Sequence, residues 1–416
     1  MSGVRPYAGL VNGSPLADPA YDPWSAAFVA DPYPAYTLLR QQPVSYHEPT
    51  DQWLVADHAG VSALLRDRRL GRTYRHVASH QEMGRQPPPD WQRPFWTLND
   101  NGMLDTEGPD HTRLRGLVSR AFTPRTVERL RPAVRRLAAG LVDRLVESGG
   151  GDLMAAVAEP LPVAVIAELL GIPEADRPLL RPWSAAITGM FELNPGRDAA
   201  ERAVAASTEF AGYLRQLIAD RRRRPGDDLV SALTAVQDST GGLTEQETVS
   251  TCVLLLNAGH EATVNTTGNG WLALLRHPDQ LARLRAEPGL LPTAVEELLR
   301  YDTPLQLFER WVLTDLEISG VRIERGAELA LVFGSANRDP ARFADPDRLD
   351  LGRRDNPHLS FGAGIHFCLG AALARLELAE SFAAVLARAP GLRLAGEPRW
   401  RPGYVIRGLA SLPVGV

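Results

Sequence analysis

The chain has 416 residues and a formal net charge of -5, and with 44% hydrophobic and 23% charged residues it has the composition of a soluble globular protein. The negative balance excludes an overall basic field that would attract nucleic acid or an anionic membrane, and no apolar run reaches the roughly 20 residues of a membrane span. Two cysteines, Cys252 and Cys368, are too few for a disulfide framework, and no signal-peptide pattern opens the chain, so we expect a cytoplasmic protein.

The domain organisation follows from what is missing between the segments. Length alone would allow two or three domains. No internal repeat and no low-complexity linker interrupts the chain. We therefore expect a single domain over residues 1–416, in which 1–21 form an extended N-terminal segment.

Helical patterns dominate in chain order. Apolar residues recur at helical spacing from 131 to 147, where three glycines end the pattern, and a second long helix is expected at about 198–224. Thr244 and Glu247 form a capping box for a helix that continues to about 276. Its stretch 252–256 has no polar side, so this helix is expected to cross the interior. Further helices are expected at 278–285, 292–300 and 371–388.

Strand-like segments are fewer, at 51–55, 312–323, 328–332 and the last dozen residues. The segment 74–104 is rich in proline and tryptophan and is expected to be irregular, and a loop of that length inside a compact domain is usually functional. The fold class is therefore predicted to be mainly α with a small β part.

The most specific pattern lies just before the helix expected at 371–388, where the chain reads Phe361-Gly-Ala-Gly-Ile-His-Phe-Cys368-Leu-Gly370. A thiol at a helix N-terminus meets backbone N–H groups that favour the thiolate. Glycines let the loop turn tightly and let a flat group approach. A single soft ligand suits iron porphyrin, because the macrocycle supplies the other equatorial ligands. The alternative is a cysteine that packs as a small hydrophobe.

This segment resembles the haem-binding loop of the cytochrome P450 monooxygenases, and the resemblance covers the chain from about Asp22 to its end. It is identified as a soluble bacterial member. The resemblance implies the triangular, helix-rich P450 fold around haem b, with Cys368 as the iron ligand. The matching positions of the loop are Phe361, Gly362, Gly364, His366, Cys368 and Gly370.

Further segments also carry the resemblance. Glu297 and Arg300 share one helix face, and in the family such a pair joins a later arginine, here Arg348, to lock the core beneath the thiolate. The alternative is an ordinary exposed ion pair. His111 and Arg115 also point the same way from a helix, and a buried haem needs partners for its two propionates. The resemblance implies a propionate clamp of His111, Arg115, Arg310 and His366.

The segment 256–263 resembles the oxygen-binding groove of the family, where small residues such as Ala258 and Gly259 let the helix pass close to the iron. Glu261 stands at the position of the family's acid, but Ala262 replaces the usual alcohol and Thr263 comes one residue later. A helix turns about 100° per residue, so Thr263 cannot stand in directly. Three explanations for the missing alcohol are open. The substrate supplies its own hydroxyl or amide, an ordered water molecule bridges the gap, or the chemistry depends less on controlled proton delivery. We favour the first two.

The substrate pocket is expected to be mainly apolar. For about half of the residues assigned to it, the alternative is ordinary core packing. The assigned residues are Phe95, Trp96, Leu98, Met190, Phe191, Leu305, Leu307, Phe308 and Ile406.

The resemblance implies a haem-thiolate monooxygenase that uses O2 to oxidise, and foremost to hydroxylate, a small organic molecule in specialised metabolism. A ferredoxin and its reductase are expected to supply two electrons, because the chain has no room for a flavin or iron–sulfur domain. Arg353, Arg354 and Arg375 are a candidate docking face, and the protein is expected to be a monomer.

Alternative functions remain open. One is oxidative C–C or C–N coupling or ring formation at the same haem without oxygen insertion. A non-catalytic haem sensor or carrier is the rival from another class. We expect a peroxide-driven enzyme or a helical protein without haem less than either of these alternatives.

Overall fold

A computed structural model describes residues 16–237 and 242–416. The extended segment expected at 1–21 therefore falls mostly outside the described residues. Its described part begins with an isolated bridge between Leu16 and Tyr46, and 17–21 contain no helix or strand.

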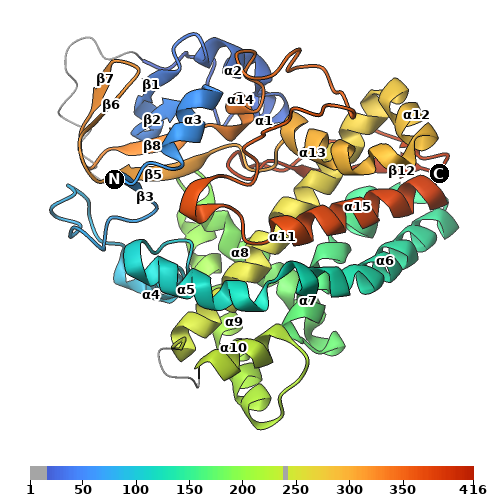
Figure 1. Cartoon of the computed structure of the whole chain (residues 1–416), viewed down its shortest axis with the longest axis horizontal. Helices are drawn as coiled ribbons and strands as arrows, with labels where there is room; N and C mark the ends of the chain where they lie inside the picture. The colour runs from blue at the N-terminus through green and yellow to red at the C-terminus, as the bar shows by residue number, and fades with distance from the viewer. Residues whose placement is uncertain (1–15, 238–241) are drawn as a thin grey trace.

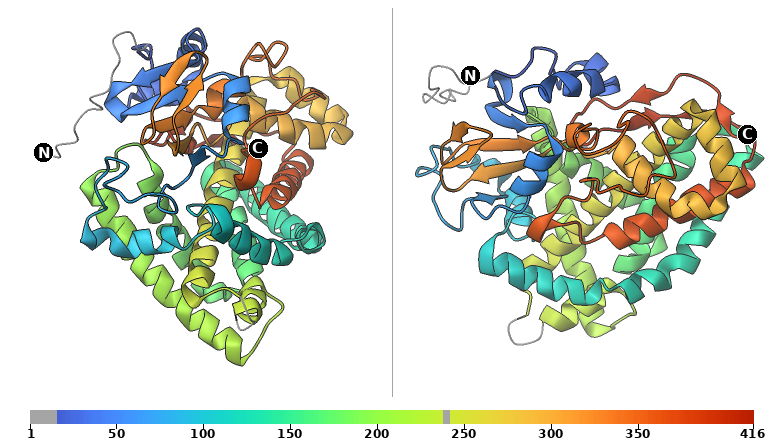
Figure 2. Two further views of the ribbon diagram at one scale, coloured as in Figure 1. Left: turned by 60° about the vertical axis from the view of Figure 1, so that its left-hand side comes forward. Right: turned by 45° about the horizontal axis from the view of Figure 1, so that its top comes forward.

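The strands of the main sheet lie with the N-terminal helices on one side of the molecule, and long helices fill most of the rest (Figures 1 and 2). The main sheet has five strands in the order β1–β2–β8–β5–β3. Strands β2 and β8 are parallel and the other neighbours antiparallel. The strands are β1 (Val44–His47), β2 (Gln52–Val55), β3 (Leu70–Gly71), β5 (Phe308–Val312) and β8 (Glu328–Leu331), and the helices on this side are α1 (Ala26–Ala30), α2 (Tyr33–Leu39), α3 (His58–Leu64) and α14 (Phe333–Ala336).

The helical part is built around α11 (Glu245–Arg276), whose capping box at Thr244 and Glu247 is confirmed. Almost every residue of α11 from Glu247 to Leu274 is buried, so the prediction that this helix crosses the interior is also confirmed. Its neighbours include α4, α7, α8, α9 and α15, and α15 packs along α6 (Figure 1). The bounds are α4 (Arg93–Asp100), α6 (Pro124–Glu147), α7 (Pro160–Leu170), α8 (Leu180–Thr188), α9 (Arg197–Arg223) and α15 (Ala371–Arg388).

Four further helices complete the helical part of the described chain. They are α5 (Gly108–Ala121), α10 (Leu229–Gln237), α12 (Pro278–Ala286) and α13 (Leu291–Tyr301). The helices expected at 131–147, 198–224, 278–285, 292–300 and 371–388 are confirmed, with α6 beginning earlier than expected.

Short strands lie outside the main sheet. The segment expected as a strand at 312–323 is divided between the end of β5 and a hairpin, which turns at Ser319 and Gly320 with φ of 50° and 81°. Of the strands near the C-terminus, 413–415 pairs with the distant segment 150–152 and with 393–394, and 409–411 pairs with 399–400. These elements are β4 (Gly150–Asp152), β6 (Leu316–Ile318), β7 (Val321–Ile323), β9 (Arg393–Leu394), β10 (Arg399–Trp400), β11 (Leu409–Ser411) and β12 (Pro413–Gly415).

The prediction of an irregular segment over 74–104 is wrong for its second half. Asp90–Gln92 form a 3-10 turn and α4 follows directly. Pro94 lies in the first turn of α4, where the missing N–H costs no helical hydrogen bond. Proline therefore opens this helix instead of excluding it.

One apolar core joins the long helices to α4 and to the C-terminal strands, from Phe95 to Val414. Two smaller clusters cover the two faces of the main sheet. No helix within 16–237 or 242–416 combines the length and the apolar character that crossing a membrane requires.

Candidate active site

The Cys368 loop and α11 line the same cavity. The loop turns at Gly362 and Gly364, whose φ values are 65° and 70°. A Cβ on Gly364 would lie 2.4 Å from the carbonyl oxygen of Leu65, so this position requires glycine for both its conformation and its space. The N–H of Cys368 donates to the carbonyl of Phe361 over 2.9 Å, which closes the loop just before α15 begins.

Burial of Cys368 raises the pKa of its thiol. The Gly370 N–H and the charges of Arg115 and Arg375 act in the opposite direction. The predicted stabilisation of the thiolate is therefore present, but it is smaller than the desolvation cost. A metal ion at the sulfur would reverse this balance, because coordination deprotonates a thiol.

Three residues of α11 form a stripe that faces the cavity. Leu254, Ala258 and Ala262 follow one another at helical spacing and are partly or fully exposed within an otherwise buried helix. Gly259 lies beside this stripe, and a Cβ there would come within 2.8 Å of Cδ1 of Ile166 on α7. The glycine predicted in the groove is thus required by the packing of α11 against α7.

Glu261 also lines the cavity and belongs to a buried ionic network. Its Oε2 accepts a hydrogen bond from Arg401 over 3.2 Å, and Arg401 also donates to Glu159 over 2.7 Å. The second oxygen of Glu159 lies 2.6 Å from Arg181, whose side chain is 56% exposed. Burial raises the pKa of Glu261, and the charge of Arg401 opposes that shift. The network connects the acid of the groove to an arginine at the surface.

The hydroxyl groups that follow Ala262 on α11 are used within the helix or turned from the stripe. Thr266 Oγ1 donates to the carbonyl of Ala262 over 2.7 Å. Thr263 lines the cavity but is 5% exposed, whereas Ala262 is open to it. The structure therefore places a methyl group where the family pattern has an alcohol.

The four residues predicted to clamp propionates surround the Cys368 loop. The rings of His111 and His366 lie 4.5 Å apart between centroids. Nε2 of His366 is 3.0 Å from Oε1 of Glu107, so a carboxylate already occupies this nitrogen. Nε2 of His111 is buried without a hydrogen-bond partner. Burial lowers the pKa of His111 to about 4, with a further contribution from His366.

Arg310 is a buried cation whose charge acts on His366 and Glu107, although neither Arg310 nor His111 is among the residues that line the cavity. It is 3% exposed, and Nη1 donates to the carbonyl of Glu309 over 2.8 Å. Among the described residues no carboxylate forms an ion pair with it, and burial lowers its pKa to about 9. Arg115 lines the cavity and donates to the carbonyl of Phe367 over 2.6 Å. A buried guanidinium without a counter-ion and the free nitrogen of His111 fit the propionates of a haem.

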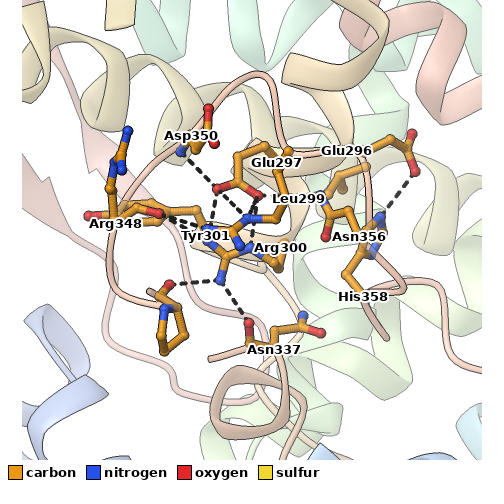
Figure 3. A network of polar contacts seen from close by, with 12 residues as sticks. Glu296, Glu297, Leu299, Arg300, Tyr301, Asn337, Arg348, Asp350, Asn356 and His358 are labelled. Atoms are coloured by element: carbon orange, nitrogen blue, oxygen red, sulfur yellow. Dashed lines mark hydrogen bonds and ion pairs between the residues drawn. The ribbon is translucent and has the colours of Figure 1, made fainter. Parts of the chain in front are cut away.

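A buried network beneath the loop holds the Glu297–Arg300 pair (Figure 3). Both side chains are 0% exposed and form two hydrogen bonds of 2.8 Å. Arg300 also donates to the carbonyls of Asn337 and Pro346. Asn337 in turn bonds Leu359 and Ser360, directly before the Cys368 loop. The pair is therefore a buried structural ion pair and not an exposed one.

The prediction that the side chain of Arg348 joins this pair is wrong. Arg353 donates from Nε to both oxygens of Glu297 over 3.2 and 3.1 Å. Arg348 is exposed and contributes only its carbonyl, which accepts from Arg300 over 3.3 Å. Arg353 and Arg375 are both held by carboxylates, so of the three arginines proposed for docking only Arg354 is exposed without such a partner in the described chain.

The residues predicted for the substrate pocket divide into two groups. Phe95, Trp96 and Met190 do not line the cavity: Phe95 belongs to the core at 1% exposure, and Trp96 donates to Gln92. Those that do line it are Leu98, Phe191, Leu305, Leu307, Phe308 and Ile406.

Glu192 ties two walls of the cavity together. Its carboxylate accepts from the N–H groups of Tyr404, Val405 and Ile406 over 2.7, 3.0 and 3.1 Å. Glu192 directly follows Phe191, and Phe191, Val405 and Ile406 all line the cavity. The segment between α8 and α9 is thus joined to the C-terminal turn.

Sequence patterns did not reveal the roles of several of these residues. Glu107, Glu159, Glu192, Arg353 and Arg401 act through contacts with distant segments, which no local spacing records. Ile166 and the cavity-lining Asn257 lie in ordinary helical patterns. Only the buried acid at position 159, unusual in an apolar helix run, offers a local signal.

Comparison with known proteins agrees with this geometry. The cytochrome P450 family model matches residues 188–388. The chain is 42% identical over 398 residues to cytochrome P450 monooxygenase PikC of Streptomyces venezuelae, covering 93% of this chain and 91% of the relative. It is 41% identical over 368 residues to polyketide biosynthesis cytochrome P450 PksS of Bacillus subtilis (strain 168), covering 88% and 89%.

A solved structure is similar over almost the whole fold. P450BioI, in complex with an acyl carrier protein ligated to hexadec-9Z-enoic acid, superposes with a TM-score of 0.88 at 37% identity and covers 94% of this chain and 100% of that one. The mainly α architecture with its small β part is that of the family. The chain therefore belongs to the cytochrome P450 family and is a haem-dependent monooxygenase of specialised metabolism.

Proposed function

We propose that haem b lies in the cavity between the Cys368 loop and α11, with the sulfur of Cys368 as the protein ligand of the iron. The observation that carries this proposal is that Cys368 and the stripe of Ala258 and Ala262 line one cavity. Phe361, Gly362 and Gly370 line the same cavity and would contact the porphyrin from the loop side. When bound, the haem supplies the activation of O2 and the oxidising chemistry.

The propionates would be held by His111, Arg115 and Arg310. Each of these side chains has donor capacity that no carboxylate of the described chain uses. His366 would act through its hydrogen bond to Glu107 and its contact with the ring of His111. The negative charge of a propionate beside His111 would favour the protonated imidazole, so the pKa of His111 would rise above its present low value.

Glu261 would hold and release the proton that the reaction consumes at the α11 side of the cavity. A buried carboxyl with a raised pKa exchanges its proton closer to neutral pH than an exposed one. Arg401 and Glu159 would orient Glu261 and link it to the surface at Arg181. Ala262 provides no hydroxyl. A polar group of the substrate or a water molecule would therefore supply the hydrogen bond that the alcohol makes in the family, at a position next to Thr263.

A ferredoxin, reduced by its reductase, would deliver two electrons near the Cys368 loop. Ile365 and Phe367 on this loop are 54% and 42% exposed, and Arg354 is also exposed. Exposed apolar side chains suit a docking partner, and the exposed charge of Arg354 suits an acidic one.

We also propose that the chain acts as a monomer. It forms one domain in this proposal, because one apolar core runs from Phe95 to Val414. Both cysteines are free, which fits the reducing cytoplasm.

The first test is spectroscopic. Purified protein that has been reduced and treated with carbon monoxide should show the strongly red-shifted Soret band of a thiolate ligand. Cys368→Ser should lose that band, whereas Cys252→Ser, which alters the other buried cysteine, should keep it. An unchanged spectrum in Cys368→Ser would contradict the proposed ligand.

The second test decides the reaction type. The site would hydroxylate a small, mainly apolar molecule, so product formed under labelled O2 should carry the label. A product without the label, formed with consumption of O2, would favour oxidative coupling or ring formation at the same site. Bound haem with no substrate-dependent consumption of reductant would favour a sensor or carrier.

A further inference from the structure

Asn257 is a polar residue of the cavity wall that the reaction described above does not use. It lies on α11 one turn before Glu261 and lines the cavity. The residue is 5% exposed, and its Oδ1 is buried without a hydrogen-bond partner. An amide buried in this way is costly unless a ligand completes its hydrogen bonds.

Several other polar side chains of the cavity are already paired. Thr188 Oγ1 donates to the carbonyl of Ser184 over 2.9 Å, and Thr266 donates to Ala262. Asn99 Nδ2 donates to the carbonyl of Phe95 over 2.9 Å. In the described chain, a buried polar atom without a partner occurs on only two other cavity-lining residues, Arg72 and Glu377.

These two residues differ from Asn257 in their surroundings. Arg72 forms ion pairs with Asp105 and Glu309 through its other nitrogens. Glu377 lies on α15, the helix that begins directly after the Cys368 loop, and therefore belongs to the thiolate side. Among the described residues that line the cavity, Asn257 is thus the one on α11 that has a buried polar atom without a hydrogen-bond partner.

We propose that the amide of Asn257 binds a hydroxyl or amide group of the substrate. This inference rests on the proposed function, in which the substrate occupies the α11 side of the cavity. An amide can donate and accept, so it recognises a group that does the same. The neighbouring wall is apolar, with Val253, Leu254 and Ile187. The substrate class is therefore a mainly apolar molecule with a hydroxyl or amide at a fixed distance from the oxidised carbon.

The position of Asn257 also connects it to the missing alcohol at Ala262. Asn257 and Glu261 are four residues apart on one helix face, which places their Cβ atoms about 5–6 Å from each other. A substrate hydroxyl held by Asn257 would lie beside the acid of the groove. Asn257 would thereby fix the orientation of the substrate, and its contribution is positioning and specificity.

The experiment uses the holoenzyme and probes anchored at the iron. Imidazoles with N-alkyl chains of increasing length bind haem iron, and the matched ω-hydroxyalkyl series moves one hydroxyl stepwise away from it. Dissociation constants are measured from the Soret shift. In the unaltered protein the hydroxyl series should bind roughly three- to tenfold more tightly than the alkyl series at one chain length, the value of one hydrogen bond.

Asn257→Leu should abolish this hydroxyl advantage while the alkyl series binds at least as tightly as before. Asn99→Leu is the matched control, because it removes a cavity amide that is already paired. It should retain the advantage. Without ligand, Asn257→Leu should keep or raise the thermal unfolding temperature, since an unpartnered amide is replaced by an apolar group of similar size.

Two results would overturn the inference: no hydroxyl advantage at any length, or an advantage that survives in Asn257→Leu, whether or not Glu261→Gln abolishes it. A fall in the unfolding temperature of ligand-free Asn257→Leu would assign the amide a structural role instead. Failure of the alkyl imidazoles to shift the Soret band would contradict the proposed haem site. This outcome is distinct from the comparisons of the hydroxyl and alkyl series, which test Asn257.

Discussion

At the scale of single residues, the protonation of Glu261 depends on Arg401, a partner 140 positions away in the chain. Arg401→Gln removes a charge that lowers the pKa of Glu261, so this pKa should rise further. The limb of the pH–rate profile that requires the ionised carboxyl should therefore move to higher pH. Reductant consumption by the holoenzyme, measured across pH with a surrogate ferredoxin system, reports this shift.

The neighbouring Arg399 provides the control for that measurement. Its Nε donates to Ser411 Oγ over 3.0 Å and it does not contact Glu261. Arg399→Gln removes the same charge from the same strand region, so its profile should match that of the unaltered protein. Equal shifts in both variants would mean that general surface charge controls the limb.

A second residue-scale prediction compares two arginines of the network beneath the loop. Arg353→Met should destabilise the protein by about 1–3 kcal/mol, because Glu297 loses a charged hydrogen-bond donor in the interior. Arg348→Met should change stability by less than about 0.5 kcal/mol, since the contact of Arg348 is made by its backbone carbonyl. Urea unfolding of the two variants decides between them, and the reverse order would restore Arg348 as the partner.

At the scale of elements, the closeness of α11 and α7 depends on Gly259. Gly259→Ala should destabilise the protein by about 1–3 kcal/mol, because the new methyl group would meet Cδ1 of Ile166. Ile166→Val removes that atom, so the double variant should recover much of the loss. Thermal unfolding of the single and double variants measures the coupling.

Gly212 on α9 is the matched control for this helical substitution. No atom lies within 4 Å of a Cβ built at Gly212. Gly212→Ala should therefore stabilise the protein by about 0.5–1 kcal/mol through helix propensity alone. If Gly259→Ala behaved in the same way, the α11–α7 contact would not be the reason for the glycine.

The elements that sequence predicts well are those with strong local signals. The capping box at Thr244 and the apolar repeat before Glu147 mark helix ends and faces that the structure contains. The proline-rich composition of 74–104 predicts an irregular segment, whereas Pro94 occupies the first turn of α4. Local pattern does not distinguish a proline that opens a helix from one that interrupts a loop.

The site likewise has parts that the sequence predicts and parts that it does not. The Cys368 loop and the groove around Glu261 are continuous segments, and both line the cavity as expected. The partners of these segments are set by tertiary contacts, as with Arg353 for Glu297 and Glu107 for His366. Chain order carries no physical record of such pairings, so they follow only from the assembled fold.

At the scale of the whole molecule, Glu296 joins three parts of the structure. It lies on α13 and bonds Arg375 on α15 over 2.6 and 2.8 Å and His358 over 3.1 Å. Burial alone would raise the pKa of Glu296, but the hydrogen bonds from Arg375 and His358 lower it from 4.5 to about 2. Because the folded pKa is lowered, the resulting stability is present above about pH 4.5 and is lost as pH falls toward 2.

Glu296→Gln should therefore be less stable than the unaltered protein at neutral pH, and the difference should narrow as the pH falls below about 5. Urea unfolding of both holoenzymes at a series of pH values measures it. Glu287→Gln, which alters a carboxylate paired with the partly exposed Arg283, should show little change with pH. A difference that widens at low pH would contradict the assigned role of Glu296.

The carboxylate of Glu192 has a consequence for the traffic of molecules through the cavity. Three successive peptide N–H groups converge on one side chain, so the C-terminal turn and the connection between α8 and α9 cannot separate by small, independent steps. Parting them breaks all three bonds together and leaves unsolvated amides behind. Any ligand path that required these two walls to part would therefore open in one cooperative step.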